Sequence, residues 1–478
     1  MQLLPKTLIR GGRFEHLPQI LKRRWRWLVA GTLGLGVAAA SIVAFMFLRV
    51  GRDTPNAALT MTSDPSMALV EVDGRKRGET PLTLALADRD HEIVLHHAGY
   101  ADSVYNVTPT AGVTTTLHAD LWLRSPRLQR LRPALPGAAI VHADFLVDGR
   151  IALILSLPPS DERQIWIVSG TRSVDRIGPP NVHGSIAVSP NAQRIAYAVR
   201  SERAGVTTRL DEVWIAQAPV EQGDPQYSVP TKSESIIDLA WARDGEHLLV
   251  VSRETITGGG VRTHLRWLMP DTGEAKDLVS LPSDIVPGSF LWSSSGQWVA
   301  FLTQSGSVPS LCLLEIETGR IHYLADVASD DTHPLPIPPL AWSPDGERLL
   351  YAALTQERSK QSGWLVGPRP KQALFLGSTD NPAGQRLGDV EAVFPVWRND
   401  DSVLAFAGAA SKGTLTLRAI STRGTGRDVG DVPLDASAYA VRWDPAHAQA
   451  LIAMRPRNSV STTNLEYWLA GWQPEEAR

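Results

Sequence analysis

Short apolar runs separated by polar turns recur along the last three-quarters of the chain. The clearest copy, Leu340–Tyr351, reads LAWSPDGERLLY: an aromatic anchor, a tight turn and a second apolar run. Six related copies surround other anchors, in chain order Phe145, Val188, Trp241, Trp292, Trp397 and Trp443. With Trp342 included, successive anchors are 43, 53, 51, 50, 55 and 46 residues apart. A period of about 50 residues with several short strands per unit is typical of a β-propeller.

Each copy predicts a strand, a tight turn and a second strand. In Ser343–Gly346 the proline presets φ at the first corner of the turn, and the glycine tolerates the positive φ that reverses the chain. The continuous apolar run Leu349–Ala353 suits a strand that is covered on both faces. The aromatic anchors are therefore expected to be core residues that pack between neighbouring units.

A third strand is predicted in every unit, and hairpin turns such as Asp271–Glu274 and Glu317–Arg320 lead to a fourth. The seven expected third strands are Gln164–Val168, Glu212–Ala216, Leu265–Met269, Leu311–Ile316, Gly363–Val366, Thr414–Ile420 and Leu465–Gly471. Four strands make one blade, so we predict an all-β fold with a propeller of seven blades over residues 137–478. A six-bladed ring is the alternative.

The last unit is one strand short, because the residues after Trp472 are too few and too charged for a fourth strand. Residues 123–136 precede the first unit and contain the alternating stretch Arg127–Arg132, which has no partner in the repeat. We expect this linker to supply the outer strand of the final blade, which would close the ring and remove an exposed edge. A basic contact strip is the alternative interpretation of its arginines.

Residues 27–48 form an uncharged stretch of 22 residues between Arg26 and Arg49. At about 1.5 Å per residue, such a helix spans the hydrocarbon core of a bilayer. Seven lysines and arginines lie in residues 1–26, so the positive-inside rule predicts a cytoplasmic N-terminal segment and extracytoplasmic domains after the linker 49–57. The predicted location is the cell membrane, with a single span. A cleaved signal peptide is the alternative, although the apolar stretch is long for one.

Small residues four apart in this span, such as Ala30, Gly34 and Ala38, would allow two helices to approach and form a weak homodimer. The net charge is −3, which gives no signal for nucleic-acid binding. The single cysteine, Cys312, lies in an apolar strand pattern and is expected to be a buried, inert thiol. No histidine, including the pair His96–His97, has the spacing of a zinc site. We therefore predict no metal and no cofactor.

Residues 58–122 form a separate unit of about six predicted short strands. Ala68–Val72 leads into the hairpin signal Asp73–Gly74, and Leu82–Leu86, His91–His96 and Thr114–Leu121 have strand length and pattern. This arrangement predicts a small β-sandwich. No group of acids or nucleophiles gathers in this segment.

Four motifs in this unit, in this order and spacing, resemble the PEGA domain: Ser63–Pro65, Val70–Gly74, Gly78–Pro81 and Gly99–Tyr100. The segment Ala87–His91 departs from the family, which usually has a glycine before its histidine. The resemblance implies an extracytoplasmic β-sandwich of binding or spacer type, without catalysis.

The Trp-Ser-Pro-Asp-Gly phrase at Trp342–Gly346 is similar to the repeat of TolB-like propellers, over residues 125–478. Propellers of prolyl-oligopeptidase-type peptidases carry it too, and the motif residues are structural in both groups. The resemblance implies a fold and assigns no catalytic, cofactor, metal or ligand-binding residue.

Together these patterns predict a non-catalytic, membrane-anchored scaffold whose propeller recognises an envelope protein or peptide. A G-x-S-x-G nucleophile elbow is absent from the sequence. Two alternatives stay open: an extracytoplasmic hydrolase acting on glycans or peptides, and an adhesin for cell-wall polysaccharide.

Overall fold

The computed structural model describes the chain from residue 57 onward. Its description omits residue 134, residue 421 and the following ranges: 160–161, 170–172, 183–184, 202–209, 219–223, 305–307, 328–338, 356–370, 388–391, 398–402, 408–414, 423–425, 435–437, 455–464 and 474–478. The predicted membrane span 27–48 lies outside the described residues. Among the residues that are described, no helix is long and apolar enough to cross a membrane.

The described chain divides into two compact units. The first holds most of a three-stranded sheet with the order β4-β1-β7, made of β1 (Ala57–Asp64), β4 (Leu82–Leu86) and β7 (Thr114–Asp120). Along β1 the side chains of Ala57, Leu59 and Met61 are buried, and the residues between them are half-buried. This period of two is the one expected for a strand with one covered face.

The second unit contains a four-stranded sheet and the propeller. The sheet has the order β3-β2-β5-β6, with β2 (Leu69–Val72), β3 (Arg75–Glu79), β5 (His91–His96) and β6 (Ser103–Val107). The predicted hairpin Asp73–Gly74 joins β2 to β3, and both residues have positive φ, 50° and 76°. The Asp73 carboxylate accepts a hydrogen bond from the Glu92 N–H at 3.0 Å and lies 2.7 Å from His91 Nδ1.

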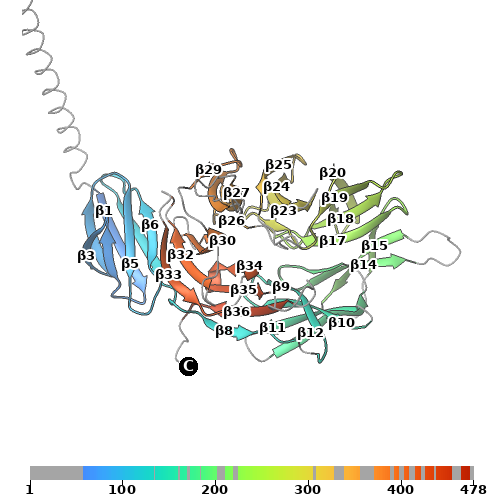
Figure 1. Cartoon of the computed structure of the whole chain (residues 1–478), viewed down its shortest axis with the longest axis horizontal. Helices are drawn as coiled ribbons and strands as arrows, with labels where there is room; N and C mark the ends of the chain where they lie inside the picture. The colour runs from blue at the N-terminus through green and yellow to red at the C-terminus, as the bar shows by residue number, and fades with distance from the viewer. Residues whose placement is uncertain are drawn as a thin grey trace, which may run out of the picture. The chain divides into compact units, whose positions relative to one another are not determined.

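Seven further sheets follow one another around a ring, which settles the choice between six and seven blades (Figure 1). We number them as blades 1 to 7. Blade 1 consists of β9 (Ala139–Phe145), β10 (Ile151–Leu157), β11 (Glu162–Ser169) and β12 (Ser173–Val182). Blade 2 consists of β13 (Ile186–Val188), β14 (Arg194–Ser201), β15 (Leu210–Gln217) and β16 (Asp224–Ser228). Blade 3 consists of β17 (Glu234–Trp241), β18 (Leu248–Thr255), β19 (Val261–Met269) and β20 (Glu274–Leu281).

The remaining blades have the same order, except that blade 4 has a divided first strand. Blade 4 consists of β21 (Asp284–Ile285), β22 (Leu291–Trp292), β23 (Trp298–Gln304), β24 (Pro309–Glu315) and β25 (Ile321–Asp326). Blade 5 consists of β26 (Leu340–Trp342), β27 (Arg348–Thr355), β28 (Lys371–Ser378) and β29 (Gln385–Arg386). Blade 6 consists of β30 (Ala392–Trp397), β31 (Val403–Ala407), β32 (Leu415–Ile420) and β33 (Gly426–Val432). Blade 7 consists of β34 (Ala438–Asp444), β35 (Gln449–Met454), β36 (Glu466–Gly471) and β8 (Arg127–Arg130).

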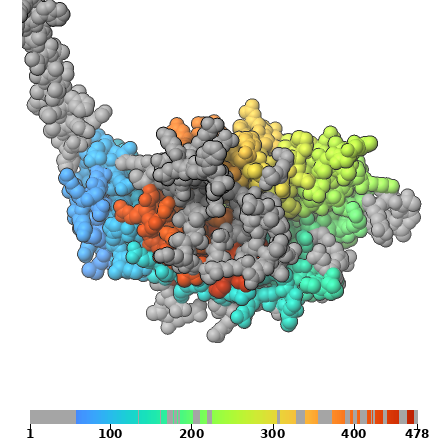
Figure 2. Space-filling view, in the orientation of Figure 1, coloured from blue at the N-terminus to red at the C-terminus, as the bar shows by residue number. Residues whose placement is uncertain are grey.

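The first strand of each blade lies toward the centre of the ring and the fourth toward its rim, and the colours in Figure 2 follow the same circuit.

One predicted strand has the wrong position. Gly363–Val366 lies outside the described residues, and the third strand of blade 5 is β28 instead. The predicted hairpins Asp271–Glu274 and Glu317–Arg320 are confirmed as the turns between the third and fourth strands of blades 3 and 4.

The tryptophan anchors join neighbouring blades, as the sequence predicted. The indole N–H of Trp241 donates to the carbonyl of Ala187 in the preceding blade at 3.3 Å. Trp342 donates to Leu291 in the same way at 3.4 Å. In these two anchors, burial of apolar surface, which is worth about 1.5–3 kcal/mol for a large side chain, is combined with a hydrogen bond that fixes the orientation of the ring.

The ring is closed by the segment before blade 1. Strand β8 pairs antiparallel with β36, with Arg127 opposite Gly471 and Arg130 opposite Trp468. One residue beyond the strand, the Leu131 N–H donates to the Tyr467 carbonyl at 2.8 Å. This is the pairing expected of the segment 127–132, and it gives blade 7 its fourth strand.

Aromatic side chains pack where the chain enters this closing strand. The ring centroid of Trp122 lies 5.5 Å from that of Trp472 and 6.1 Å from that of Trp443. Trp122 and Trp472 are 3% and 0% exposed, so their packing contributes to the hydrophobic core of blades 6 and 7.

Candidate functional site

The first strand of blade 4 is divided by a β-turn, Val286–Ser289, which we call the channel turn. The Ser289 N–H donates to the Val286 carbonyl at 3.2 Å, and Gly288 has φ 76°. Proline at the second position and a glycine of positive φ at the third are the requirements of a type II turn. Both are met by Pro287 and Gly288.

The channel turn replaces a stretch of regular pairing. In blades 2 and 5, the N–H groups of Ala198 and Ala352 donate at 2.8 and 2.9 Å to the backbone carbonyls of Ser185 and Pro339, the residues just before the first strand. The corresponding N–H in blade 4, that of Leu302, donates to the side-chain oxygen of Ser289 at 3.1 Å. The Ser289 hydroxyl therefore gives the Leu302 N–H a hydrogen-bond acceptor at a point where the backbone of the turn has left the sheet.

Three other blades contact the channel turn. From blade 3, the Asp238 carboxylate accepts the Gly288 N–H at 2.6 Å. From blade 7, the Arg442 guanidinium donates to the carbonyls of Gly288 and Phe290 at 3.0 and 3.3 Å. From blade 1, the His142 ring lies next to Gly288: a Cβ atom added to this glycine would be 3.8 Å from Nδ1 of His142. Since blades 1, 3, 4 and 7 meet only around the axis of the ring, the channel turn lies in the central channel.

Several charged groups of this site do not form close pairs. Asp144 Oδ2 lies 4.0 Å from His142 Nε2 and 3.9 Å from Arg442 Nε. Arg442 Nε is buried and has no hydrogen-bond partner within the described part of the chain. A buried donor without a partner is uncommon in proteins and points to a bound water or ligand atom. Asp144 is thus near both cations but too far from either for a direct hydrogen bond.

Solvent reaches these groups although protein surrounds them. The side chains of His142 and Asp144 are 35% and 44% exposed, whereas that of Arg442 is 9% exposed. Burial nevertheless lowers the pKa of His142, and nearby Arg442 lowers it further against the opposing effect of Asp144. Arg243, an exposed residue in the turn after β17, belongs to the same set of charges: burial lowers its pKa against the opposing effect of nearby Asp144. His142 and Asp144 are therefore partly desolvated while they remain partly exposed at the centre of the ring.

Asp238 also has a shifted pKa. Burial raises its pKa to about 6, against the opposing effects of the Gly288 and Leu239 N–H groups and of Arg163 and Arg442. Its protonation state therefore changes in the pH range of many natural environments.

Sequence reasoning did not identify this site, although one signal was present. In the seven copies of the repeat, the residue before the anchor is Asp144, Ala187, Ala240, Leu291, Ala341, Val396 and Arg442 in turn. Only Asp144 and Arg442 are charged, and both lie at the channel site. An alignment of the copies would have singled them out, because a first strand turns alternate residues toward the axis.

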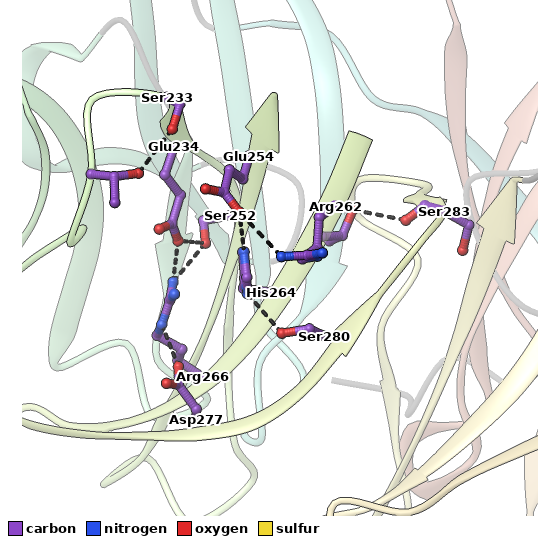
Figure 3. A network of polar contacts seen from close by, with 12 residues as sticks. Ser233, Glu234, Ser252, Glu254, Arg262, His264, Arg266, Asp277, Ser280 and Ser283 are labelled. Carbon is purple, nitrogen blue, oxygen red and sulfur yellow. Dashed lines mark hydrogen bonds and ion pairs between the residues drawn. The ribbon is translucent and has the colours of Figure 1, made fainter. Parts of the chain in front are cut away.

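A second polar network lies on blade 3, and Figure 3 shows its members. Glu234 and Arg266 form an ion pair whose side chains are 2% and 6% exposed. Arg266 Nη1 also donates to Ser252 Oγ at 2.8 Å, and its Nε donates to Asp277 Oδ1 at 2.6 Å. Because every member has partners inside the network, we interpret this part as a structural feature of the blade.

The more exposed half of the network brings together a serine, a histidine and an acid (Figure 3). His264 Nδ1 lies 2.7 Å from Ser280 Oγ, and His264 Nε2 lies 3.2 Å from Glu254 Oε2. Arg262 is 3.9 Å from Glu254 and 51% exposed. The three groups lie on adjacent strands β18, β19 and β20, where one face of the sheet places them side by side.

The other residues singled out in the sequence are not parts of a site. Cys312 is 5% exposed, and burial raises its pKa, as expected for an inert thiol. His96 is 2.9 Å from Asp102 and 3.7 Å from Glu71. Within the described residues, no three His, Cys, Asp or Glu side chains form a group that could hold a metal ion.

Comparison with known proteins gives one family match. The PEGA domain family matches residues 57–124. A search of curated proteins by sequence found no match.

Solved structures that resemble the chain have low sequence identity to it. An oligogalacturonate lyase in complex with manganese is 12% identical, with a TM-score of 0.45, and the match covers 81% of this chain and 97% of that one. The β-propeller domain of the Trilobed protease from Pyrococcus furiosus is 13% identical, with a TM-score of 0.41 and coverages of 71% and 94%. TolB from Acinetobacter baumannii is 14% identical, with a TM-score of 0.31 and coverages of 73% and 79%. The chain thus combines a PEGA domain with a seven-bladed propeller, and its neighbours include both enzymes and TolB.

Proposed function

We propose that this protein is a non-catalytic binding scaffold whose propeller recognises a segment of an envelope protein at the central channel. The observation that carries this proposal is the set of charged groups around Asp144 at the centre of the ring: His142 and Asp144 are partly exposed, and Arg442 Nε is buried without a hydrogen-bond partner among the described residues. Such groups are oriented in advance by a rigid ring, so a ligand can bind them without ordering them first.

The chemistry of the channel suits a peptide. A peptide offers N–H donors to Asp144 and carbonyl acceptors to Arg442 Nε and Arg243. Asp144 would repel a free carboxylate, and the two arginines would repel an ammonium group. In this proposal, residues 27–48 anchor the chain in the cell membrane, the domains from residue 57 lie outside the cytoplasm, and the PEGA domain serves as a spacer or second contact.

The proposal is tested by affinity capture with the full chain, purified in mild detergent and incubated with envelope extracts of its source. We expect one stoichiometric protein, identified by mass spectrometry. Arg243→Glu should reduce its retention about tenfold, because it reverses a charge at the channel. The matched control is Arg320→Glu, an exposed arginine in the turn before β25. Equal retention by the two variants would contradict a contact at the channel.

A hydrolase is the second candidate, and the group Ser280–His264–Glu254 favours it. A histidine that accepts a serine proton while an acid orients its ring is the arrangement of an activated nucleophile. Labelling with a fluorophosphonate probe would test it. A hydrolase predicts labelling of Ser280 that is lost in His264→Ala and kept in Ser283→Ala, a nearby serine drawn in Figure 3. No labelling of Ser280 would leave the binding function as the better account.

A further inference from the structure

The channel turn belongs to the chain itself, and yet three other blades bind it as they would bind a ligand. Its contacts with Asp238 and Arg442 all involve backbone N–H and carbonyl groups of Gly288 and Phe290. Contacts of this kind are open to any peptide segment that presents the same backbone.

We infer that the channel turn is an internal plug, a stand-in for the partner peptide, and that partner binding requires its displacement. This inference rests on the proposed function and names its ligand class: a peptide segment that forms a Pro-Gly turn or an equally narrow backbone. Asp238 accepts an N–H of such a segment, and Arg442 donates to two of its carbonyls.

The tip of the channel turn is suited to displacement: Val286 and Phe290 on either side of it are buried in the core, but few hydrogen bonds connect the tip to the sheet. Only Asp284 and Ile285 pair with β23 on one side of the turn, and only Leu291 and Trp292 on the other. Between these pairs, one backbone bond from Val286 to Leu302 and one side-chain bond from Ser289 connect the turn to the sheet. Pro287, at the tip of the turn, is exposed.

The plug also leaves part of the site unused. Arg442 Nε has no hydrogen-bond partner among the described residues, and Asp144 lies 3.9 Å from it. A longer segment from a partner would bind the same groups as the channel turn and would reach these as well. This difference gives a partner the additional contacts that it needs to replace an intramolecular segment.

The test uses a fluorescein-labelled peptide with the sequence of residues 284–292, DIVPGSFLW, and the full chain. Fluorescence anisotropy would measure its binding to the wild type and to Gly288→Ala. Alanine at φ 76° is strained, which raises the population of the displaced plug and should tighten peptide binding about fivefold or more. A scrambled peptide of the same composition controls for non-specific binding.

Gly296→Ala is the matched control protein. Gly296 has φ 72° in the hairpin turn of the same blade, and a Cβ there would meet nothing within 4 Å, so the variant carries the same strain outside the channel. We expect its affinity to stay within about twofold of wild type. Pro287→Gly loosens the channel turn without adding a side chain, and it should tighten binding even if Gly288→Ala folds poorly.

Equal affinity of Gly288→Ala and Gly296→Ala for the peptide would contradict the inference that the channel turn is a displaceable plug. The absence of peptide binding in every variant would contradict it too. Either result leaves the capture experiment with envelope extracts unaffected. If instead capture fails while the peptide binds Gly288→Ala more tightly than Gly296→Ala, recognition of an envelope protein fails, and only the displacement of the channel turn by a peptide is supported. The two failures are thus told apart.

Discussion

Replacing Glu234 by alanine should strongly destabilise the propeller, because it leaves a buried cation without its closest partner. Glu234 and Arg266 are 2% and 6% exposed, and both also contact the fully buried hydroxyl of Ser252. Burial alone would lower the pKa of Arg266, but its bond with Glu234 and the charges of Tyr227, Glu234 and Asp277 together raise it. Removing Glu234 takes away part of this support, but an arginine guanidinium does not lose its proton in proteins, so Arg266 stays charged in the variant.

The size of the effect follows from what remains around Arg266. Removal of one partner from a buried ion pair costs about 3–5 kcal/mol. Asp277 still accepts from Arg266 Nε, but its side chain is 78% exposed, so solvent screens it. We therefore expect a loss of about 3 kcal/mol in the free energy of unfolding. Replacing both charges, with Glu234→Leu and Arg266→Met together, should restore stability to within about 1 kcal/mol of wild type.

Urea denaturation followed by tryptophan fluorescence would measure both variants. Arg200→Ala is the matched control, since Arg200 pairs with Asp211 at 3.0 Å but is 59% exposed. Such a pair contributes about 1 kcal/mol or less. If Glu234→Ala is no less stable than Arg200→Ala, the reasoning about the buried network is wrong.

Three further predictions follow from other parts of the molecule. Leu131→Ala should cost about 2–4 kcal/mol, because Leu131 is 6% exposed between blades 7 and 1; an unchanged melting temperature would show that the closing segment does not support the ring. Cys312 should react with a thiol reagent only after unfolding, since it is buried and burial raises its pKa; rapid reaction of the native protein would contradict its burial. Because the folded pKa of Asp238, about 6, is raised, its stabilising contribution is complete below about pH 4 and is lost as the pH rises through 6. The stability of wild type relative to Asp238→Asn should thus fall by up to about 3 kcal/mol between pH 4 and 7, and a difference independent of pH would refute this.

The repeat predicted most of the propeller because each copy contains its own local signals. The turn residues of Ser343–Gly346 and the apolar run after them determine a hairpin wherever they occur. The ring-closing strand was also predictable, since a blade short of one strand requires a partner and Arg127–Arg132 has the right pattern. The third strand of blade 5 was misplaced because Gly363–Val366 and Lys371–Ser378 are both apolar enough for a strand.

The channel site depends on contacts that no local pattern contains. Asp238, Arg442 and His142 are far apart in sequence and meet because the ring brings the first strands of several blades around one axis. Val286–Ser289 has the residues of a type II turn, but that pattern predicts an ordinary loop. Only the closure of the ring turns it into a segment held by other blades.

The pairing of β8 with β36 also determines how the propeller responds to force. Both ends of the propeller chain meet in blade 7, so tension applied through residues before β8 acts first on this strand pair. Because β8 is antiparallel to β36 and Arg127 is opposite Gly471, the two chain ends lie at the same end of the pair. Tension between these ends therefore opens the hydrogen bonds one after another, from Arg127 toward the Leu131–Tyr467 bond. The closing strand is thus the first part of the ring to open when the two ends are pulled apart.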